Sequence, residues 1–236
     1  MRPVALIAMN FVREQRIFLI LLVAYVLLGG VAILIAGERP ATEDVLFLVK
    51  QHASYAIFFG IALASSAIYN ERKSRRILAV LSKAVTRREY LAGLILGSSS
   101  VLWIYLVALT AGGAALFLAS GLSLRDLFAA VLMAAIATLL AASITIFYCT
   151  FLHPWLALTA TMLTLTVPPL FSIHFGESAN MAVPAFELMR EIFAWSADSA
   201  IHVNAFAVTI TVVEIAALWL VAARIFSYRD VAVAVE

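Results

Sequence analysis

The chain alternates long runs of apolar residues with short polar segments. Runs of about 20 apolar residues are long enough to cross the hydrocarbon core of a bilayer as helices. Six such runs predict spans at residues 17–36, 53–70, 91–119, 127–152, 155–175 and 201–223. We therefore expect an all-α integral membrane protein with six transmembrane helices, folded as a single transmembrane domain over residues 1–236.

Two shorter stretches have one apolar and one polar face, which is typical of helices that lie at the membrane surface. The first precedes the first span, and the second begins at Pro184, before the last span. Their apolar positions are Val4, Ile7, Ala8 and Phe11 in the first stretch and Phe186, Met189 and Phe193 in the second. We predict an N-terminal amphipathic helix and short outer helices before the last span.

Glycine and proline give two further expectations about the spans. Gly93 and Gly97 have the GxxxG spacing that lets another helix approach closely. Pro168 and Pro169 lie near the outer end of the fifth span and remove backbone donors there, so we expect the helix to kink or stop.

The composition supports a membrane protein and excludes several other classes. Hydrophobic residues make up 64% of the chain, charged residues 13%, and the mean hydropathy is +1.04. The single cysteine, Cys149, cannot form an internal disulfide, and no Cys/His spacing matches a zinc site. His52, His174 and His202 fall near the predicted outer surface without helical pairing, which weighs against a metal site. We expect no metal, no cofactor and no nucleic-acid partner.

Basic residues are concentrated in one loop and set the predicted topology. Seven of the sixteen lie between Arg72 and Arg88, beside only two acidic residues, Glu71 and Glu89. Loops rich in Lys and Arg stay in the cytoplasm. With this loop inside, six spans place both termini in the cytoplasm and twelve of the sixteen basic residues inside. We predict a multi-pass protein of a bacterial-type cytoplasmic (inner) membrane.

The same loop also carries apolar residues at helical spacing. Ile77, Leu78 and Leu81 share one face, whereas the basic residues point in other directions. This pattern favours a short cytoplasmic helix that docks on a partner. The alternative is that the basic residues only mark the topology, which leaves the apolar face without a role.

The end of this loop resembles the coupling-helix region of ATP-binding cassette type-2 (ABC-2) permeases. The matching positions are Glu71, Val85-Thr86-Arg87, Glu89-Tyr90-Leu91, Gly93 and Gly97. Three positions depart from the family pattern, since Ser74-Arg75 replaces a glycine, Ala84 a proline and Leu94 a lysine. The departures concern the local bend of the loop, and the predicted layout of the whole chain is also similar to that of the family.

The resemblance implies the membrane subunit of an exporter whose ATPase is a separate chain. Such a complex has two ATPase copies and a second permease copy or paralogue. The sequence contains no GxxxxGK[ST] phosphate loop, so we expect no enzymatic activity of its own. The residues implied to contact the ATPase are Glu71, Ile77, Leu78, Leu81, Arg87, Arg88 and Glu89.

Glu214 is the only acidic residue inside a predicted span. An acidic group in the middle of a membrane is costly, about 2.5–3.5 kcal/mol on insertion scales, and should face protein or water. It either lines a translocation path or carries a proton, or it is a protonated carboxyl group hydrogen-bonded to a neighbouring span. Glu214 also keeps two alternative functions open, an ion-coupled secondary transporter that uses this residue and a non-transporting membrane scaffold.

Overall fold

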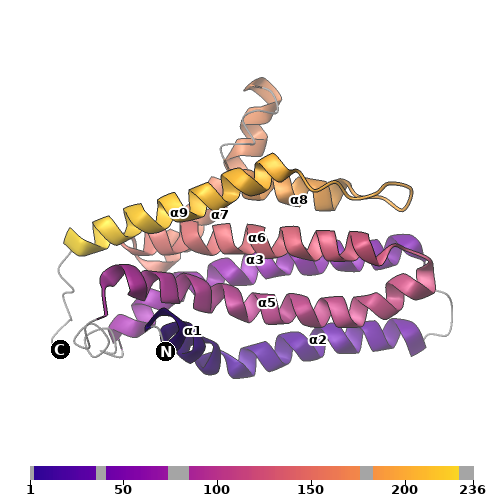
Figure 1. Cartoon of the computed structure of the whole chain (residues 1–236), viewed down its shortest axis with the longest axis horizontal. Helices are drawn as coiled ribbons and strands as arrows, with labels where there is room; N and C mark the ends of the chain where they lie inside the picture. Colours follow the sequence, from indigo (N-terminus) through magenta and orange to yellow (C-terminus); the bar gives the residue numbers. More distant parts are fainter. Residues whose placement is uncertain (1–2, 36–40, 74–84, 176–182, 229–236) are drawn as a thin grey trace.

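The computed structural model describes residues 3–35, 41–73, 85–175 and 183–228, and every regular element within these ranges is an α-helix. The helices are α1 (Pro3–Glu14), α2 (Arg16–Ile35), α3 (Thr42–Lys73), α5 (Arg87–Ser120), α6 (Leu124–Cys149), α7 (Pro154–Phe175), α8 (Pro184–Ala194) and α9 (Ala205–Tyr228) (Figure 1). The predicted all-α class is confirmed for these ranges.

Five of the helices, α2, α3, α5, α6 and α9, are long and apolar enough to cross a membrane. This identifies a multi-pass membrane protein. In α7, the part whose side chains are described is the apolar stretch Pro154–Val167, which is too short to test the predicted fifth span. The structure therefore bears out five of the six predicted spans by length and composition.

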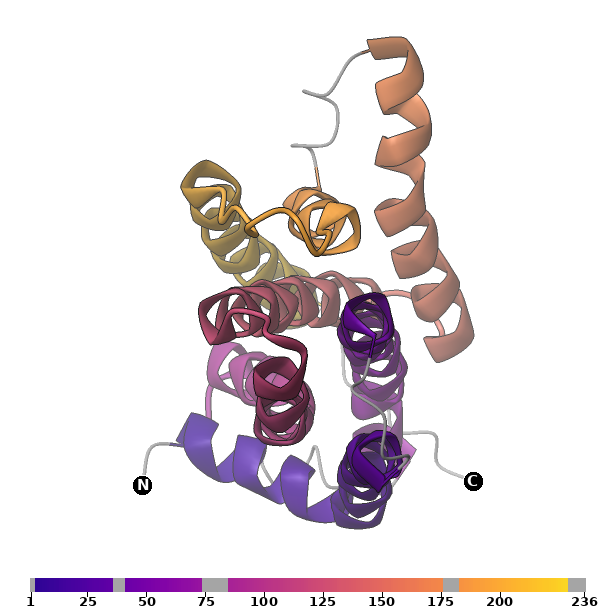
Figure 2. The same ribbon diagram turned by 90° about the vertical axis from the view of Figure 1, so that its right-hand side faces the viewer.

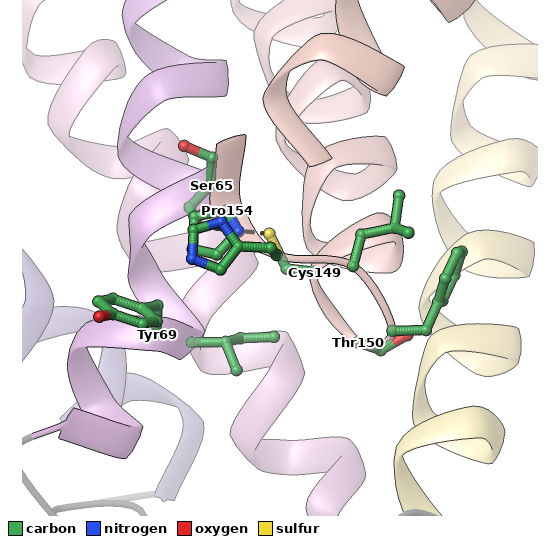
Figure 3. A pocket seen from close by; sticks show the side chains of 9 residues that line it. Ser65, Tyr69, Cys149, Thr150 and Pro154 are labelled. Carbon is green, nitrogen blue, oxygen red and sulfur yellow. Dashed lines mark hydrogen bonds between the residues drawn. The ribbon is translucent and has the colours of Figure 1, made fainter. Parts of the chain in front are cut away.

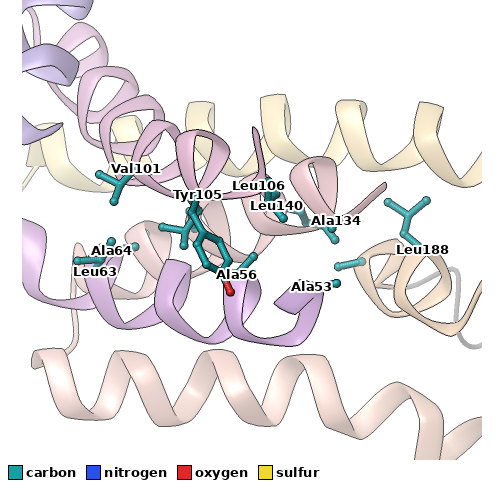
Figure 4. Packing of buried hydrophobic residues seen from close by; sticks show 14 of the residues in the cluster. Ala53, Ala56, Leu63, Ala64, Val101, Tyr105, Leu106, Ala134, Leu140 and Leu188 are labelled. Carbon is teal, nitrogen blue, oxygen red and sulfur yellow. The ribbon is translucent and has the colours of Figure 1, made fainter. Parts of the chain in front are cut away.

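Helices α3, α5 and α6 pack against one another and form the centre of the bundle. Helix α2 packs on α5, while α7, α8 and α9 all pack on α6 (Figure 2). The side chains between the three central helices are a mixture of small and large apolar groups (Figure 4). Those drawn there include Ala53 and Ala56 of α3, Val101, Tyr105 and Leu106 of α5, and Ala134 and Leu140 of α6.

Helix α3 begins at Thr42, eleven residues before the predicted start of the second span at Ala53. The residues from Thr42 to His52, which lie between the first two predicted spans, are therefore helical. Val45 and Val49 are buried at helical spacing, and the acidic first turn favours a helix N-terminus. The prediction was wrong because the polar residues from Lys50 to His52 interrupt the apolar run without interrupting the helix.

Helix α1 runs across one end of the bundle, at a steep angle to the spans, and packs on the first turns of α5 (Figure 2). The contact uses the predicted GxxxG pair. A Cβ atom added at Gly93 would lie 2.7 Å from Ile7, and one added at Gly97 would lie 2.8 Å from Phe11. The two glycines therefore allow α1 to approach α5 closely, and the helix they admit is the N-terminal amphipathic helix.

Helix α7 leaves the bundle at a steep angle, and its C-terminal end lies far from the other helices (Figures 1 and 2). It continues to Phe175 and so does not stop at Pro168 and Pro169. Helix α7 contacts both α3 and α6. Only residues 150–153 separate its N-terminal end from the end of α6.

Helix α8 confirms a short helix before the last span, and its buried face agrees with the predicted one in part, since Met189 is buried as predicted. Phe193 is 52% exposed, whereas Leu188 and Ile192 are fully buried against α6 and α9. Glu187 is also buried and accepts a 2.6 Å hydrogen bond from Arg190. The predicted apolar face of Phe186, Met189 and Phe193 did not include Glu187, whose ion pair within one helix turn allows the carboxylate to be buried.

The α1–α5 contact predicts opposite effects for two glycine substitutions in α5. Gly93→Ala should destabilise the protein by about 1–3 kcal/mol, because the new methyl group overlaps Ile7. Gly112→Ala should be neutral or stabilising, since its methyl group meets Leu27 at an ordinary 3.7 Å and alanine favours a helix. Unfolding of the purified chain in detergent measures both, and equal stability of the two variants would contradict this account of the contact.

Candidate functional site

The predicted ATPase contact falls partly on the first turn of α5. Arg87, Arg88 and Glu89 are described there, whereas Ile77, Leu78 and Leu81 lie outside the described residues. Glu71 belongs to the last turn of α3, of which the backbone is described. The end of α3, the start of α5, helix α1 and the end of α9 all lie at the same end of the bundle (Figure 1).

Glu89 has a structural role at the start of α5. The Thr86 hydroxyl accepts a hydrogen bond from the Glu89 backbone N–H at 3.2 Å, and the Glu89 carboxylate accepts one from the Thr86 backbone N–H at 2.9 Å. This reciprocal pair is a capping box, which satisfies two backbone donors that the helix itself leaves free. Thr86 and Glu89 therefore fix the residue at which α5 begins.

Arg87 joins the start of α5 to the end of α9. Its guanidinium group donates a hydrogen bond to the Phe226 carbonyl oxygen and lies 5.5 Å from the centre of the Phe226 ring. The Tyr90 ring stacks on the same Phe226 ring, with ring centres 6.1 Å apart. A cation at a helix C-terminus is favourable because the carbonyl groups there lack partners within the helix.

A second hydrogen bond between α5 and α9 reinforces this connection about two helix turns before Phe226. The Trp219 indole N–H donates to the Arg88 carbonyl oxygen at 3.0 Å, while the Arg88 side chain is exposed. Trp219 and Phe226 are seven residues apart, about two helix turns, so both lie on the side of α9 that faces α5. We call Arg87, Tyr90, Trp219 and Phe226 the α5–α9 junction.

Glu214 lines a cavity of about 330 Å³ between α6, α7 and α9. Phe147 and Tyr148 of α6 and Thr164 of α7 line the same cavity. The Tyr148 and Thr164 hydroxyls bond to each other at 2.9 Å, and within the described ranges no hydrogen bond or ion pair reaches Glu214. The structure thus places the carboxyl group in a cavity rather than in a hydrogen bond with a neighbouring helix. Chemically, it offers a titratable group or a negative charge.

A second cavity, of about 290 Å³, lies beside the turn between α6 and α7 (Figure 3). Ser65 and Tyr69 of α3 line it, together with Cys149 and Pro154. The Cys149 thiol is buried and donates to the Ser65 carbonyl oxygen at 3.4 Å, which ties α6 to α3. Cys149 therefore contributes to the packing of α6 against α3.

The outer histidines do not form a common site in the described part of the chain. His52 is buried and its Nδ1 atom is hydrogen-bonded to the Tyr105 hydroxyl, between α3 and α5. His202 is exposed before α9, and the side chain of His174 lies outside the described residues. Among the described residues there is no group of three metal-ligating side chains.

The α5–α9 junction was not predicted from the sequence. The T-x-x-E spacing of Thr86 and Glu89 could have located the start of α5, because it is the signature of a capping box. No comparable sequence signal pairs Arg87 with Phe226, since the two residues lie 139 positions apart.

Comparison with known proteins does not identify a family. No protein-family model matches the chain, and the search of curated proteins finds no significant relative.

The junction predicts different roles for two adjacent arginines. Arg87→Met should lower the unfolding free energy by about 1.5–3 kcal/mol, because the side chain keeps its length but loses the hydrogen bond to Phe226. Arg88→Met is the matched control, since it keeps the backbone bond to Trp219 and changes only an exposed side chain. Equal losses of stability in denaturant unfolding would rule out a specific role for Arg87.

Proposed function

We propose that the protein is the permease subunit of an ATP-binding cassette exporter. Its ATPase would be a separate chain, present in two copies, and a second permease copy or paralogue would complete the complex. The proposal rests first on the resemblance between residues 71–97 and the coupling region of ABC-2 permeases. The absence of a GxxxxGK[ST] motif agrees with an ATPase on another chain.

The observation that best supports this function is the α5–α9 junction. An ATPase that drives transport must move the membrane helices, and the segment between α3 and α5 is its proposed contact. Because Arg87 and Tyr90 bind the end of α9 directly, a displacement of the start of α5 is passed to α9. Helix α9 carries Glu214, so the proposed contact is mechanically connected to the cavity.

The described residues suggest how the contact is divided. Arg87 and Glu89 hold the start of α5 in place, whereas the Arg88 side chain is exposed and available to an ATPase. Ile77, Leu78 and Leu81 would supply the apolar area. Each would contribute about 1.5–3 kcal/mol if fully buried in the partner.

Glu214 favours one alternative, an ion-coupled secondary transporter. A titratable group in a membrane cavity is a common coupling residue in such proteins. Co-purification separates the two functions, because a tagged exporter permease should recover a chain with a phosphate loop. A chain that transports in vesicles without any ATPase would instead support ion coupling.

The proposed topology places the two ends of the bundle on opposite sides of the membrane, with the basic end in the cytoplasm. In a Cys149→Ser background, Ser227→Cys at the end of α9 should be shielded from an impermeant thiol reagent in intact cells. Ser123→Cys in the turn between α5 and α6 should be labelled. Permeabilised cells provide the control, in which both should react. The reverse labelling pattern in intact cells would overturn this orientation.

The proposed contact predicts loss of the ATPase when its apolar or basic residues are changed. Leu81→Asp should abolish co-purification, because it places a charge in an apolar contact. Arg88→Glu should weaken retention at low salt, and the difference from wild type should shrink as salt screens the charges. Arg125→Glu, an exposed arginine at the opposite end of the bundle, is the matched control. Full retention of the ATPase by Leu81→Asp would show that the loop only marks the topology.

A further inference from the structure

The cavity at Glu214 has the position and polarity of a binding site. Glu214 lies nine residues after the start of α9 and fourteen before its end, so it is near the middle of a membrane-spanning helix. An acidic side chain at this depth is costly unless it meets water or a partner. No described side chain supplies a positive charge to it. A ligand with a positive charge would meet this need.

The walls of the cavity suit an apolar body attached to that charge. Phe147 and Tyr148 line the cavity from α6, and Leu218 and Val221 line it from α9. Aromatic rings attract cations through their faces as well as burying apolar surface. The Tyr148 hydroxyl is already bonded to Thr164, so it does not compete for the carboxylate of Glu214.

The cavity is large enough for an organic molecule. Its volume of about 330 Å³ lies within the range of small-molecule sites. Ala217 and Val221 of its lining are exposed, so the cavity is open on the α9 side. A membrane-soluble molecule could therefore enter from the lipid.

We propose that this cavity binds a lipophilic organic cation whose charge pairs with Glu214 and whose apolar body contacts Phe147, Tyr148 and Leu218. A neutral lipid has no positive charge to pair with the carboxylate, and the carboxylate repels an organic anion. A metal ion requires several oxygen ligands, whereas Glu214 is the only carboxylate among the described residues that line the cavity. That the bound cation is also the transported substrate rests on the proposed exporter function, while its binding does not.

The sign of the ligand charge is the first test. The purified full chain in lipid nanodiscs is titrated with tetraphenylphosphonium and, separately, with tetraphenylborate, two ions of nearly the same shape and opposite charge. We expect saturable binding of the phosphonium ion and no competition by the borate ion. Equal binding of the two ions would show that the cavity selects for size alone, and would overturn the proposal.

Two pairs of variants locate the site. Glu214→Gln should weaken phosphonium binding at least tenfold, whereas Glu43→Gln, the same change at the exposed start of α3, should leave it unchanged. Ala217→Phe fills the cavity but keeps the carboxylate, and it should weaken binding at least fivefold. Its control is Ala216→Phe, at an exposed neighbour that does not line the cavity.

The pairs remain informative if one variant fails to fold. Ala217→Phe decides the question alone if Glu214→Gln does not yield folded protein. Phosphonium binding that is unchanged in Ala217→Phe, or in folded Glu214→Gln, would overturn the proposal. The assay contains no ATPase, so a failed search for the ATPase would overturn the exporter function without affecting this result.

Discussion

The packing of α6 against its neighbours is the constraint on which the rest of the structure depends. In a membrane, lipid is as apolar as the side chains, so helices associate through close contact rather than through exclusion of water. Ala134, Ala137 and Ala141 follow one face of α6 and are fully buried. The buried hydroxyls of Thr138 and Thr145 donate to carbonyl groups of α6 itself, so they require no partner from another helix. This smooth helix can therefore contact α3, α5, α7, α8 and α9 at once.

The sequence predicted the helices well where one physical rule determined them. Long apolar runs located α2, α5, α6 and α9 to within a few residues, because lipid admits few other structures. The start of α3 and part of the buried face of α8 were predicted wrongly, since both regions bury polar residues that have hydrogen-bond partners. His52 is hydrogen-bonded to Tyr105 on another helix, and Glu187 is hydrogen-bonded to Arg190 on the same helix.

The candidate sites were predictable in location but not in role. The basic loop and Glu214 stand out in any reading of the chain, because charge is rare in it. The role of each residue in the first turn of α5 depends on the direction of its side chain. Successive side chains of a helix point about 100° apart. Arg87 therefore faces α9, Arg88 faces outward and Tyr90 is buried. Adjacent residues of the same charge thus have different surroundings, which composition cannot reveal.

The steep angle of α7 has a mechanical consequence. The helix is attached to α6 through the short turn of residues 150–153, and its far end lies away from the bundle. A rigid rod held at one end changes position mainly by rotating about that end. Thr164 is ten residues from Pro154, roughly 15 Å along the axis. A rotation of about 10° would therefore carry Thr164 by about 2.6 Å, roughly the length of its hydrogen bond to Tyr148, given the helical rise. A small rotation at the turn beside Cys149 would thus change the width of the space in front of Glu214.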